Sequence, residues 1–157
     1  MTAKRDLSIR KARPTDSAPL ARLRNQLWPD SSAEEHAREL AGILAGRPPG
    51  KLPLEILVAE SSEGRLVGYV EVGLRSHAEG CDETREAGYL EGWFVLEGHR
   101  RKGIGGALPR AAESWARSQG CTEMASDASL ANEDSRRAHE ALGFMLAGRS
   151  VNYRKAL

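Results

Sequence analysis

Apolar and polar side chains alternate over several short runs of this chain, and this period of two is typical of β-strands. The runs over 54–60 and 66–74 are joined by Ser61-Ser62-Glu63-Gly64, a combination of residues that predicts a hairpin turn. The strands predicted from such runs are 7–12, 54–60, 66–74, 89–96, 123–126, 144–147 and 151–155.

Helical spacing of apolar residues and cap signals fill the gaps between these strands. The predicted helices are one capped by Thr15 or Asp16 and ended by Pro29, one from Ser31 or Ser32 to about Ala45, one from about 103 to 119, and one over 132–142. Each of the two serines has a glutamate three residues later, the spacing of a capping box. Pro109 lies inside the third helix and removes one backbone donor, so we expect a kink or an irregular turn there.

The resulting order is β-α-α-β-β-β-α-β-α-β-β. A strand–helix–strand unit in the middle predicts a parallel pair, and the hairpins on either side predict antiparallel neighbours. The expected fold class is therefore α/β, with a mixed, mostly antiparallel sheet and helices on both faces. The length of 157 residues fits a single domain over 1–157.

Charge and cysteine content narrow the function classes. With 23 basic and 22 acidic side chains the formal charge is +1, which gives no bulk attraction to nucleic acid or to a membrane surface. Residues 1–6 lack the apolar core of a signal peptide, and no apolar run approaches the length of a membrane span. Cys81 and Cys121 have neither disulfide-framework nor metal-ligand spacing, so we expect a cytoplasmic protein without a metal site.

The run His99-Arg100-Arg101-Lys102-Gly103-Ile104-Gly105-Gly106 follows the strand 89–96 and opens the third helix. Unpaired backbone N–H groups and the positive end of a helix dipole suit phosphate oxygens, and glycines allow the anion to approach closely. The spacing matches neither a nucleoside-triphosphate P-loop nor a dinucleotide fingerprint. The alternative is a solvated basic turn.

Two carboxylates carry the candidate chemistry. Glu91 interrupts an apolar strand, and Asp127 follows the strand 123–126 at its carboxyl end, where α/β folds place ligands. Carboxylates in such positions can bind a cationic group and accept its proton; a primary amine, with a pKa of about 10.4, is such a cation near neutral pH. Glu91 could instead form a buried ion pair with an arginine, and Asp127 could shape a turn or cap a helix.

The Arg-x-x-Gly-x-Gly pattern in the basic loop resembles the pyrophosphate loop of the GCN5-related N-acetyltransferases (GNAT). A closer resemblance, over about residues 9–155, is to their aminoglycoside 6′-N-acetyltransferase subgroup. It is carried by Leu23-Arg24-Asn25-Gln26-Leu27-Trp28-Pro29, by 75–81, by Tyr89-Leu90-Glu91-Gly92-Trp93, by Met124-Ala125-Ser126-Asp127 and by 132–144. It implies the GNAT fold, transfer of acetyl from acetyl-CoA to the 6′-amine of an antibiotic, and a homodimer.

The resemblance also implies roles at matching positions. The substrate pocket would be lined by Trp28, His77, Glu91 and Asp127, with the two carboxylates holding the amino groups. The coenzyme would contact Trp93, Phe94, Val95, Arg100, Arg101, Lys102, Gly103, Ile104, Gly105, Gly106 and Asn132. His139 stands where many acetyltransferases have a tyrosine as the thiol-side acid.

One position departs from the subgroup: Met145-Leu146-Ala147-Gly148 lacks a glutamate that often follows Gly-Phe, which leaves the range of drugs open. Trp28 could be simple packing, His77 a solvated loop residue and His139 a structural histidine. Nothing near either cysteine activates it, which favours direct attack in a ternary complex. The rival functions are acetylation of another small-molecule or peptide amine, and a coenzyme sensor or nucleic-acid module without catalysis.

Overall fold

A five-stranded sheet in the order β1-β2-β3-β4-β5 organises the computed structural model, which describes residues 7–157. The strands are β1 (Leu7–Lys11), β2 (Leu54–Ser61), β3 (Leu66–Arg75), β4 (Ala87–Val95) and β5 (Met124–Ser126). Neighbours are antiparallel except β4 and β5, which are parallel. The predicted mixed sheet is confirmed, whereas the signal-peptide prediction concerns residues outside the described range.

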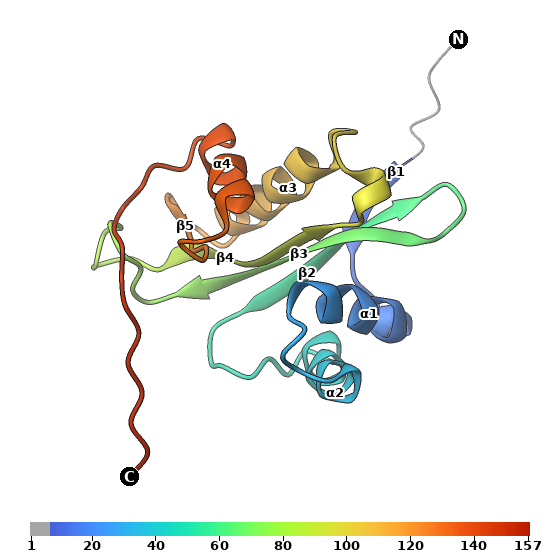
Figure 1. Cartoon of the computed structure of the whole chain (residues 1–157), viewed down its shortest axis with the longest axis horizontal. Helices are drawn as coiled ribbons and strands as arrows, with labels where there is room; N and C mark the ends of the chain where they lie inside the picture. The colour runs from blue at the N-terminus through green and yellow to red at the C-terminus, as the bar shows by residue number, and fades with distance from the viewer. Residues whose placement is uncertain (1–6) are drawn as a thin grey trace.

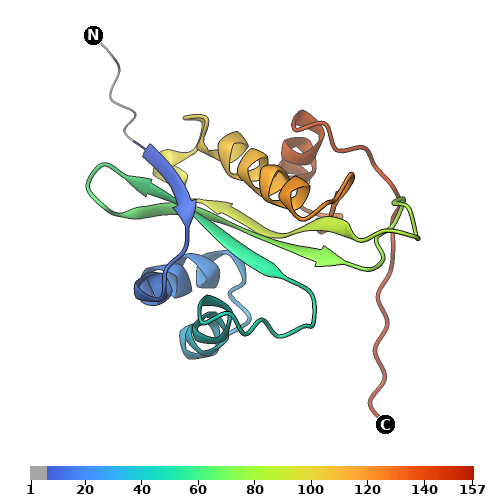
Figure 2. The same cartoon turned by 180° about the vertical axis from the view of Figure 1, so that it is seen from behind.

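Helices cover both faces of the sheet (Figures 1 and 2), as predicted. They are α1 (Ser17–Leu27), α2 (Ala33–Leu44), α3 (Ile104–Ser118) and α4 (Glu133–Ala141), with short 3-10 turns at Pro14–Asp16 and Glu97–His99. Helices α1 and α2 lie on one face, and α3 and α4 lie on the other (Figure 1). The longest helix described, α3, is too short to cross a membrane.

Two apolar clusters hold these layers together. Leu108 and Ala112 of α3 are fully buried against one face of the sheet, and Leu20 and Leu40 of α1 and α2 are fully buried against the other. Strand β3 lies between the clusters, so both of its faces are covered and its middle residues are buried. This burial explains why the run 66–74 is almost continuously apolar.

Local cap predictions have mixed outcomes. The Ser32 box is confirmed, because Ser32 Oγ accepts from the Glu35 N–H at 3.2 Å and the Glu35 carboxylate accepts from the Ser32 N–H at 2.8 Å. Asp16 precedes α1 but its side chain does not cap that helix; it accepts instead from Arg10 and from the Arg13 backbone. The irregular turn expected at Pro109 is absent, because α3 runs unbroken through this buried proline.

The predicted strands at 144–147 and 151–155 are wrong. After α4 the chain turns at Gly143, whose φ of +90° favours glycine, and no strand forms over 144–157. A strand needs a neighbour to pair with, and this segment passes the 76–86 loop and then extends away from the sheet (Figures 1 and 2). Its alternating apolar residues are therefore exposed, among them Met145, Leu146, Val151 and Tyr153.

Candidate active site

Strand β4 separates from β5 halfway along its length. The parallel pairing joins only Gly88–Leu90 to Met124–Ser126, and β5 ends there. In the part of the chain that the structure describes, no strand pairs with the outer edge of β4 from Glu91 to Val95. The backbone donors and acceptors along that edge are available to a ligand.

Trp93, Phe94 and Val95 lie on this open part of β4. Val95 is buried in the cluster under α3, and Trp93 packs partly against the same cluster. Phe94 faces the opposite side of the sheet, with its ring 6.4 Å from that of Tyr69. Because these side chains are anchored, the backbone between them is held in place.

The basic loop after β4 has the geometry of an anion site. Gly103 is the N-cap of α3 with φ +80°, and within residues 7–157 no side chain caps this helix. The first N–H groups of Ile104, Gly105 and Gly106 therefore point out of the helix end. The exposed cations Arg100, Arg101 and Lys102 precede them directly.

Two details fix the shape of this loop. Arg101 has φ +63°, the single non-glycine residue with a positive φ among those described. The Arg100 Nε donates to the Val95 carbonyl at 2.9 Å, which ties the loop to the end of β4. The structure thus brings the predicted phosphate-binding residues together at one helix terminus beside the open strand edge.

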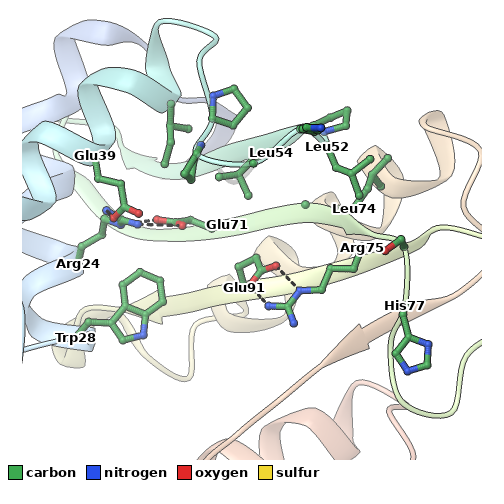
Figure 3. A pocket seen from close by; sticks show the side chains of 18 residues that line it. Arg24, Trp28, Glu39, Leu52, Leu54, Glu71, Leu74, Arg75, His77 and Glu91 are labelled. Atoms are coloured by element: carbon green, nitrogen blue, oxygen red, sulfur yellow. Dashed lines mark hydrogen bonds and ion pairs between the residues drawn. The ribbon is translucent and has the colours of Figure 1, made fainter. Parts of the chain in front are cut away.

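A cavity of about 570 Å³ lies on the α1–α2 side of the sheet. Figure 3 shows its wall at Trp28, its acidic side chains Glu39, Glu71 and Glu91, and His77 at the end opposite Trp28. The close contact of Trp28 with β4 requires a glycine, since a Cβ at Gly92 would lie 2.6 Å from the indole ring. Trp28 is therefore positioned by packing and also forms part of the cavity.

Glu91 lies at a β-bulge. The register between β3 and β4 shifts between Glu71 and Val72, which pair with Gly92 and Leu90 and leave Glu91 without an opposite residue. A bulge turns two successive residues to one face, and both Glu91 and Gly92 face the cavity side. Local backbone geometry thus aims the carboxylate into the cavity.

Arg75, at the end of β3, forms an ion pair with the Glu91 carboxylate. Its Nε and Nη2 donate to the two carboxylate oxygens at 2.8 and 2.6 Å (Figure 3). These hydrogen bonds raise the pKa of the Arg75 guanidinium. The alternative interpretation of Glu91 as an arginine partner is therefore right about the pairing but not about burial, because both side chains are partly exposed at the cavity.

Asp127 comes directly after β5, next to the point where the two strands part. Because Leu90 pairs with Ser126, the next residues along the two strands are Glu91 and Asp127. Asp127 is exposed and does not line the cavity itself. Burial and the charge of the Asp127 carboxylate raise the pKa of Tyr89 to about 12.

His139 of α4 lies beside the same divergence. Its Nδ1 donates to the Ser135 carbonyl at 2.7 Å, because a carbonyl can only accept, and its Nε2 lies 2.8 Å from Ser126 Oγ, which donates to the Leu90 carbonyl at 3.2 Å. The ring is edge-on to Trp93 and Phe144, at centroid distances of 5.8 and 5.4 Å. Both nitrogens are engaged, so the imidazole is firmly oriented.

Asn132 has a structural role, because its side chain accepts from the Ser135 N–H at 3.1 Å and caps α4.

Sequence reasoning overlooked a buried pair, Arg24 and Glu71, whose Nε and Oε1 lie 2.6 Å apart at the base of the cavity (Figure 3). The signal was present, since Glu71 interrupts an apolar strand just as Glu91 does. Among the described residues, no group of three or more His, Cys, Asp or Glu could hold a metal ion.

Comparison with known proteins agrees with this geometry. The Acetyltransferase (GNAT) family matches residues 18–144, and the chain belongs to that family. An "Aminoglycoside N(6')-acetyltransferase type 1" from Klebsiella aerogenes is 42% identical over 149 residues, 95% of this chain and 96% of the relative. The Serratia marcescens protein of the same name is 40% identical, over 86% of this chain and 89% of its own.

Solved structures lead to the same family. Aminoglycoside N-acetyltransferase AAC(6')-Iy in complex with CoA superimposes with a TM-score of 0.88 at 32% identity, covering 100% of this chain and 99% of that one. AAC(6')-Iy with the bisubstrate analog CoA-S-monomethyl-acetylneamine gives 0.85 at 33% identity, covering 96% and 99%. The expected fold and family are confirmed.

Proposed function

We propose that this chain transfers acetyl from acetyl-CoA to the 6′-amine of aminoglycoside antibiotics, by direct attack in a ternary complex. The observation that carries the proposal is a juxtaposition. A cavity on one side of β4 holds the carboxylates Glu39, Glu71 and Glu91, and it borders a strand edge that opens where β4 parts from β5 and leads to an uncapped basic helix terminus. The named relatives supply the substrate class.

The coenzyme end of the site is assigned to the basic loop and the strand edge. The N–H groups of residues 103–106, with Arg100, Arg101 and Lys102, suit a pyrophosphate by charge and by donor number. The backbone of Trp93, Phe94 and Val95 holds the pantetheine arm and donates to the thioester oxygen as charge develops there. Asn132 contacts the coenzyme arm in this proposal, in addition to capping α4.

At the amine end, Glu91 and Asp127 bind ammonium groups and accept the proton that must leave before attack. Removing that proton near pH 7 costs about 3 pK units, or about 4 kcal/mol, which nearby carboxylates offset. Trp28 and His77 line the cavity at either side. Rate then comes mainly from positioning and from donors already in place.

His139 is the proposed source of the proton for the departing thiolate. With the ring protonated on both nitrogens, the Nε2–H donates to the Ser126 oxygen while the Ser126 hydroxyl passes its own proton to the thiolate, so the ring loses one proton and the hydroxyl is restored. Neither cysteine supports a covalent acetyl intermediate. Burial raises the pKa of both the Cys81 and the Cys121 thiol, so both are poor nucleophiles near neutral pH.

A thiol-release assay with aminoglycosides that have and lack a free 6′-amine tests the function. Release with the first group alone supports it, and faster turnover of an unrelated amine overturns the substrate class. That second candidate, another small-molecule or peptide amine, is favoured by Gly148, which packs against Glu79 where the subgroup often has a glutamate nearby.

Asp127→Asn tests the residue assignment. We expect it to impair acetylation while leaving coenzyme binding nearly intact, as measured by calorimetry. Asp134→Asn, which removes a charge from the exposed first turn of α4, is the matched control. Loss of coenzyme binding in Asp127→Asn would make Asp127 structural.

A homodimer is part of the proposal, with 144–157 as its contact. Large apolar side chains on this extended segment are exposed, including Met145 at 90% and Tyr153 at 92%. A second copy is the occupant that buries them, since patches of this kind mark interaction sites. Sedimentation of the full chain should give a dimer, and deletion of 145–157 should give a monomer; a monomeric full chain overturns the dimer proposal.

The free cysteines support a reducing compartment, the cytoplasm.

A further inference from the structure

Arg75 holds the carboxylate that the proposed function assigns to the substrate amine. Both Glu91 oxygens accept from its guanidinium, in the two-pronged arrangement typical of strong arginine–carboxylate pairs. The pair lies at the cavity wall, with 43% of the Arg75 side chain and 28% of the Glu91 side chain exposed. The Arg75 guanidinium thus occupies the position that the proposed function assigns to an ammonium group of the substrate.

The same guanidinium lies over Tyr89. Its Cζ is 3.5 Å from the centre of the phenol ring, a cation–π contact. Tyr89 and Glu91 are two residues apart on β4, and Asp127 raises the pKa of both Arg75 and Tyr89 by its charge. Arg75 is therefore held by the Glu91 carboxylate and by the face of the Tyr89 ring, with the charge of Asp127 nearby.

Nothing else fixes the guanidinium. Within residues 7–157 its only hydrogen-bond partner is Glu91, and Ser76 and His77 beyond it are exposed loop residues. The buried Arg24 is different, because it contacts both Glu39 and Glu71 and its side chain is only 5% exposed. Arg75 can swing its head group into water while its stem stays on the protein.

We propose that Arg75 is an internal counter-ion that substrate displaces: an incoming ammonium replaces the guanidinium on Glu91. The inference rests on the proposed function, because it assumes that Glu91 binds substrate. In the free protein Arg75 balances a carboxylate close to Asp127, Glu39 and Glu71. On binding, this ion pair must be broken, and only a ligand with several positive charges regains enough attraction. Arg75 thereby weakens the binding of every amine by the same free energy, and only polycations, which also reach the other carboxylates, still bind appreciably.

The test compares Arg75→Gln with the wild type in the thiol-release assay and in calorimetric binding of a 6′-amine aminoglycoside. Without the competing cation, we expect KM and Kd for the amine to fall about 3- to 10-fold with kcat within about twofold, the size of a partly exposed pair. KM for a monoamine should fall by a similar factor, because the ion pair that has to be broken is the same. Arg75→Lys, which keeps the charge, should stay near the wild type.

Arg85→Gln is the matched control, since it removes an equal charge from an exposed position of the loop between β3 and β4 that does not line the cavity. It should leave KM near the wild-type value. An unchanged or raised KM in Arg75→Gln, with a wild type that turns over, overturns the inference, because Arg75 would then be inert or would itself contact substrate or orient Glu91. A wild type that acetylates no aminoglycoside overturns the proposed function instead, so the two failures are distinguishable.

Discussion

Arg10 and Arg75 make the same bond in two different settings. Each grips a carboxylate with two nitrogens: Arg10 bonds Asp16 at 2.7 and 3.0 Å, and Arg75 bonds Glu91 at 2.8 and 2.6 Å. Arg10 lies on β1 at one edge of the sheet, and Arg75 lies at the mouth of the cavity. Hydrogen-bond lengths alone would make the two ion pairs equivalent.

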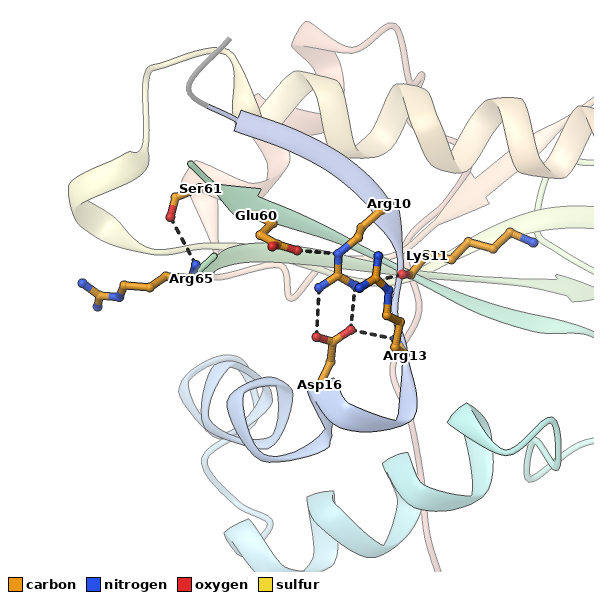
Figure 4. Close-up of polar contacts among 7 residues, drawn as sticks. All are labelled: Arg10, Lys11, Arg13, Asp16, Glu60, Ser61 and Arg65. Atoms are coloured by element: carbon orange, nitrogen blue, oxygen red, sulfur yellow. Dashed lines mark hydrogen bonds and ion pairs between the residues drawn. The ribbon is translucent and has the colours of Figure 1, made fainter. Parts of the chain in front are cut away.

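The surroundings make them different. Arg10 also pairs with Glu60, and Asp16 also accepts from the Arg13 N–H at 2.7 Å (Figure 4), so the cluster joins β1, β2 and the turn before α1. The Asp16 side chain is only 10% exposed. The hydrogen bonds from Arg10 hold the pKa of Asp16 below its ordinary value.

The Arg75 pair joins only two adjacent strands, and both side chains are partly open to water. A closed network of charges contributes to folding, whereas an open pair contributes little and can be exchanged. The difference teaches that connectivity and burial, rather than bond length, separate a structural ion pair from one available for binding.

Glu91→Gln should have the largest effect. We expect kcat/KM for a 6′-amine aminoglycoside to fall about 100-fold, equivalent to about 2.7 kcal/mol, because a charged hydrogen-bond partner of the ammonium is lost. The free energy of unfolding, from urea titration, should change by less than about 1 kcal/mol. A large loss of stability with normal turnover would reverse the comparison.

Asp16→Asn should show the opposite pattern. We expect the free energy of unfolding to fall by about 2 kcal/mol, because two arginine bonds and a turn lose their acceptor charge. The kcat/KM should stay within about twofold of the wild type. Glu63→Gln in the exposed β2–β3 turn is the charge-matched control and should unfold like the wild type. Equal stability of all three proteins would contradict a structural role for the cluster.

Lowering the pH should abolish the contribution of Asp16 to the free energy of unfolding. Since its pKa is lowered by folding, the stabilisation is complete above the unfolded value of about 3.9 and is lost as the pH falls through the folded pKa. The difference in unfolding free energy between wild type and Asp16→Asn should be full at pH 7 and should shrink below about pH 4. Urea titrations at stepped pH measure it; a constant difference would mean that charge is not the cause.

Glu55→Gln should have the smallest effect. Its partner Lys11 lies 3.2 Å away with 69% of its side chain exposed, so the pair resembles neither of the others. We expect the free energy of unfolding, from urea titration, to fall by less than about 0.5 kcal/mol, with no change in turnover. A loss close to that of Asp16→Asn would show that exposure is not what separates these pairs.

Prediction from sequence succeeded where the signal is local. The hairpin at 61–64, the Ser32 cap and the glycine turn before α3 each depend on neighbouring residues, and each is present. The strands at 144–147 and 151–155 failed because alternation predicts a strand only if a neighbour exists to pair with it. Asp16 failed as a helix cap because Arg10 of the preceding strand, only six residues away, competes for its carboxylate, and cap patterns do not take this contact into account.

Within the candidate site, residue types were predictable and partners were not. A glutamate inside an apolar strand indicates that Glu91 matters, but no pattern in the chain indicates the bulge that aims it or the arginine that holds it. The same signal at Glu71 was overlooked, and its partner Arg24 lies 47 residues away. Contacts at such separations depend on strand register, which is a property of the assembled sheet.

The sequence by itself determined the elements as far as α4, their order, the glycine turn before α3 and the family, because these rest on periodicity, caps and motif spacing over a few residues. Only the tertiary structure decided which charges meet. Strand pairing ends at Ser126, the bulge turns Glu91 toward the cavity, and Arg75 reaches it from the neighbouring strand. Coulomb energy depends on distance and on exposure to water, and both are set when the layers pack together.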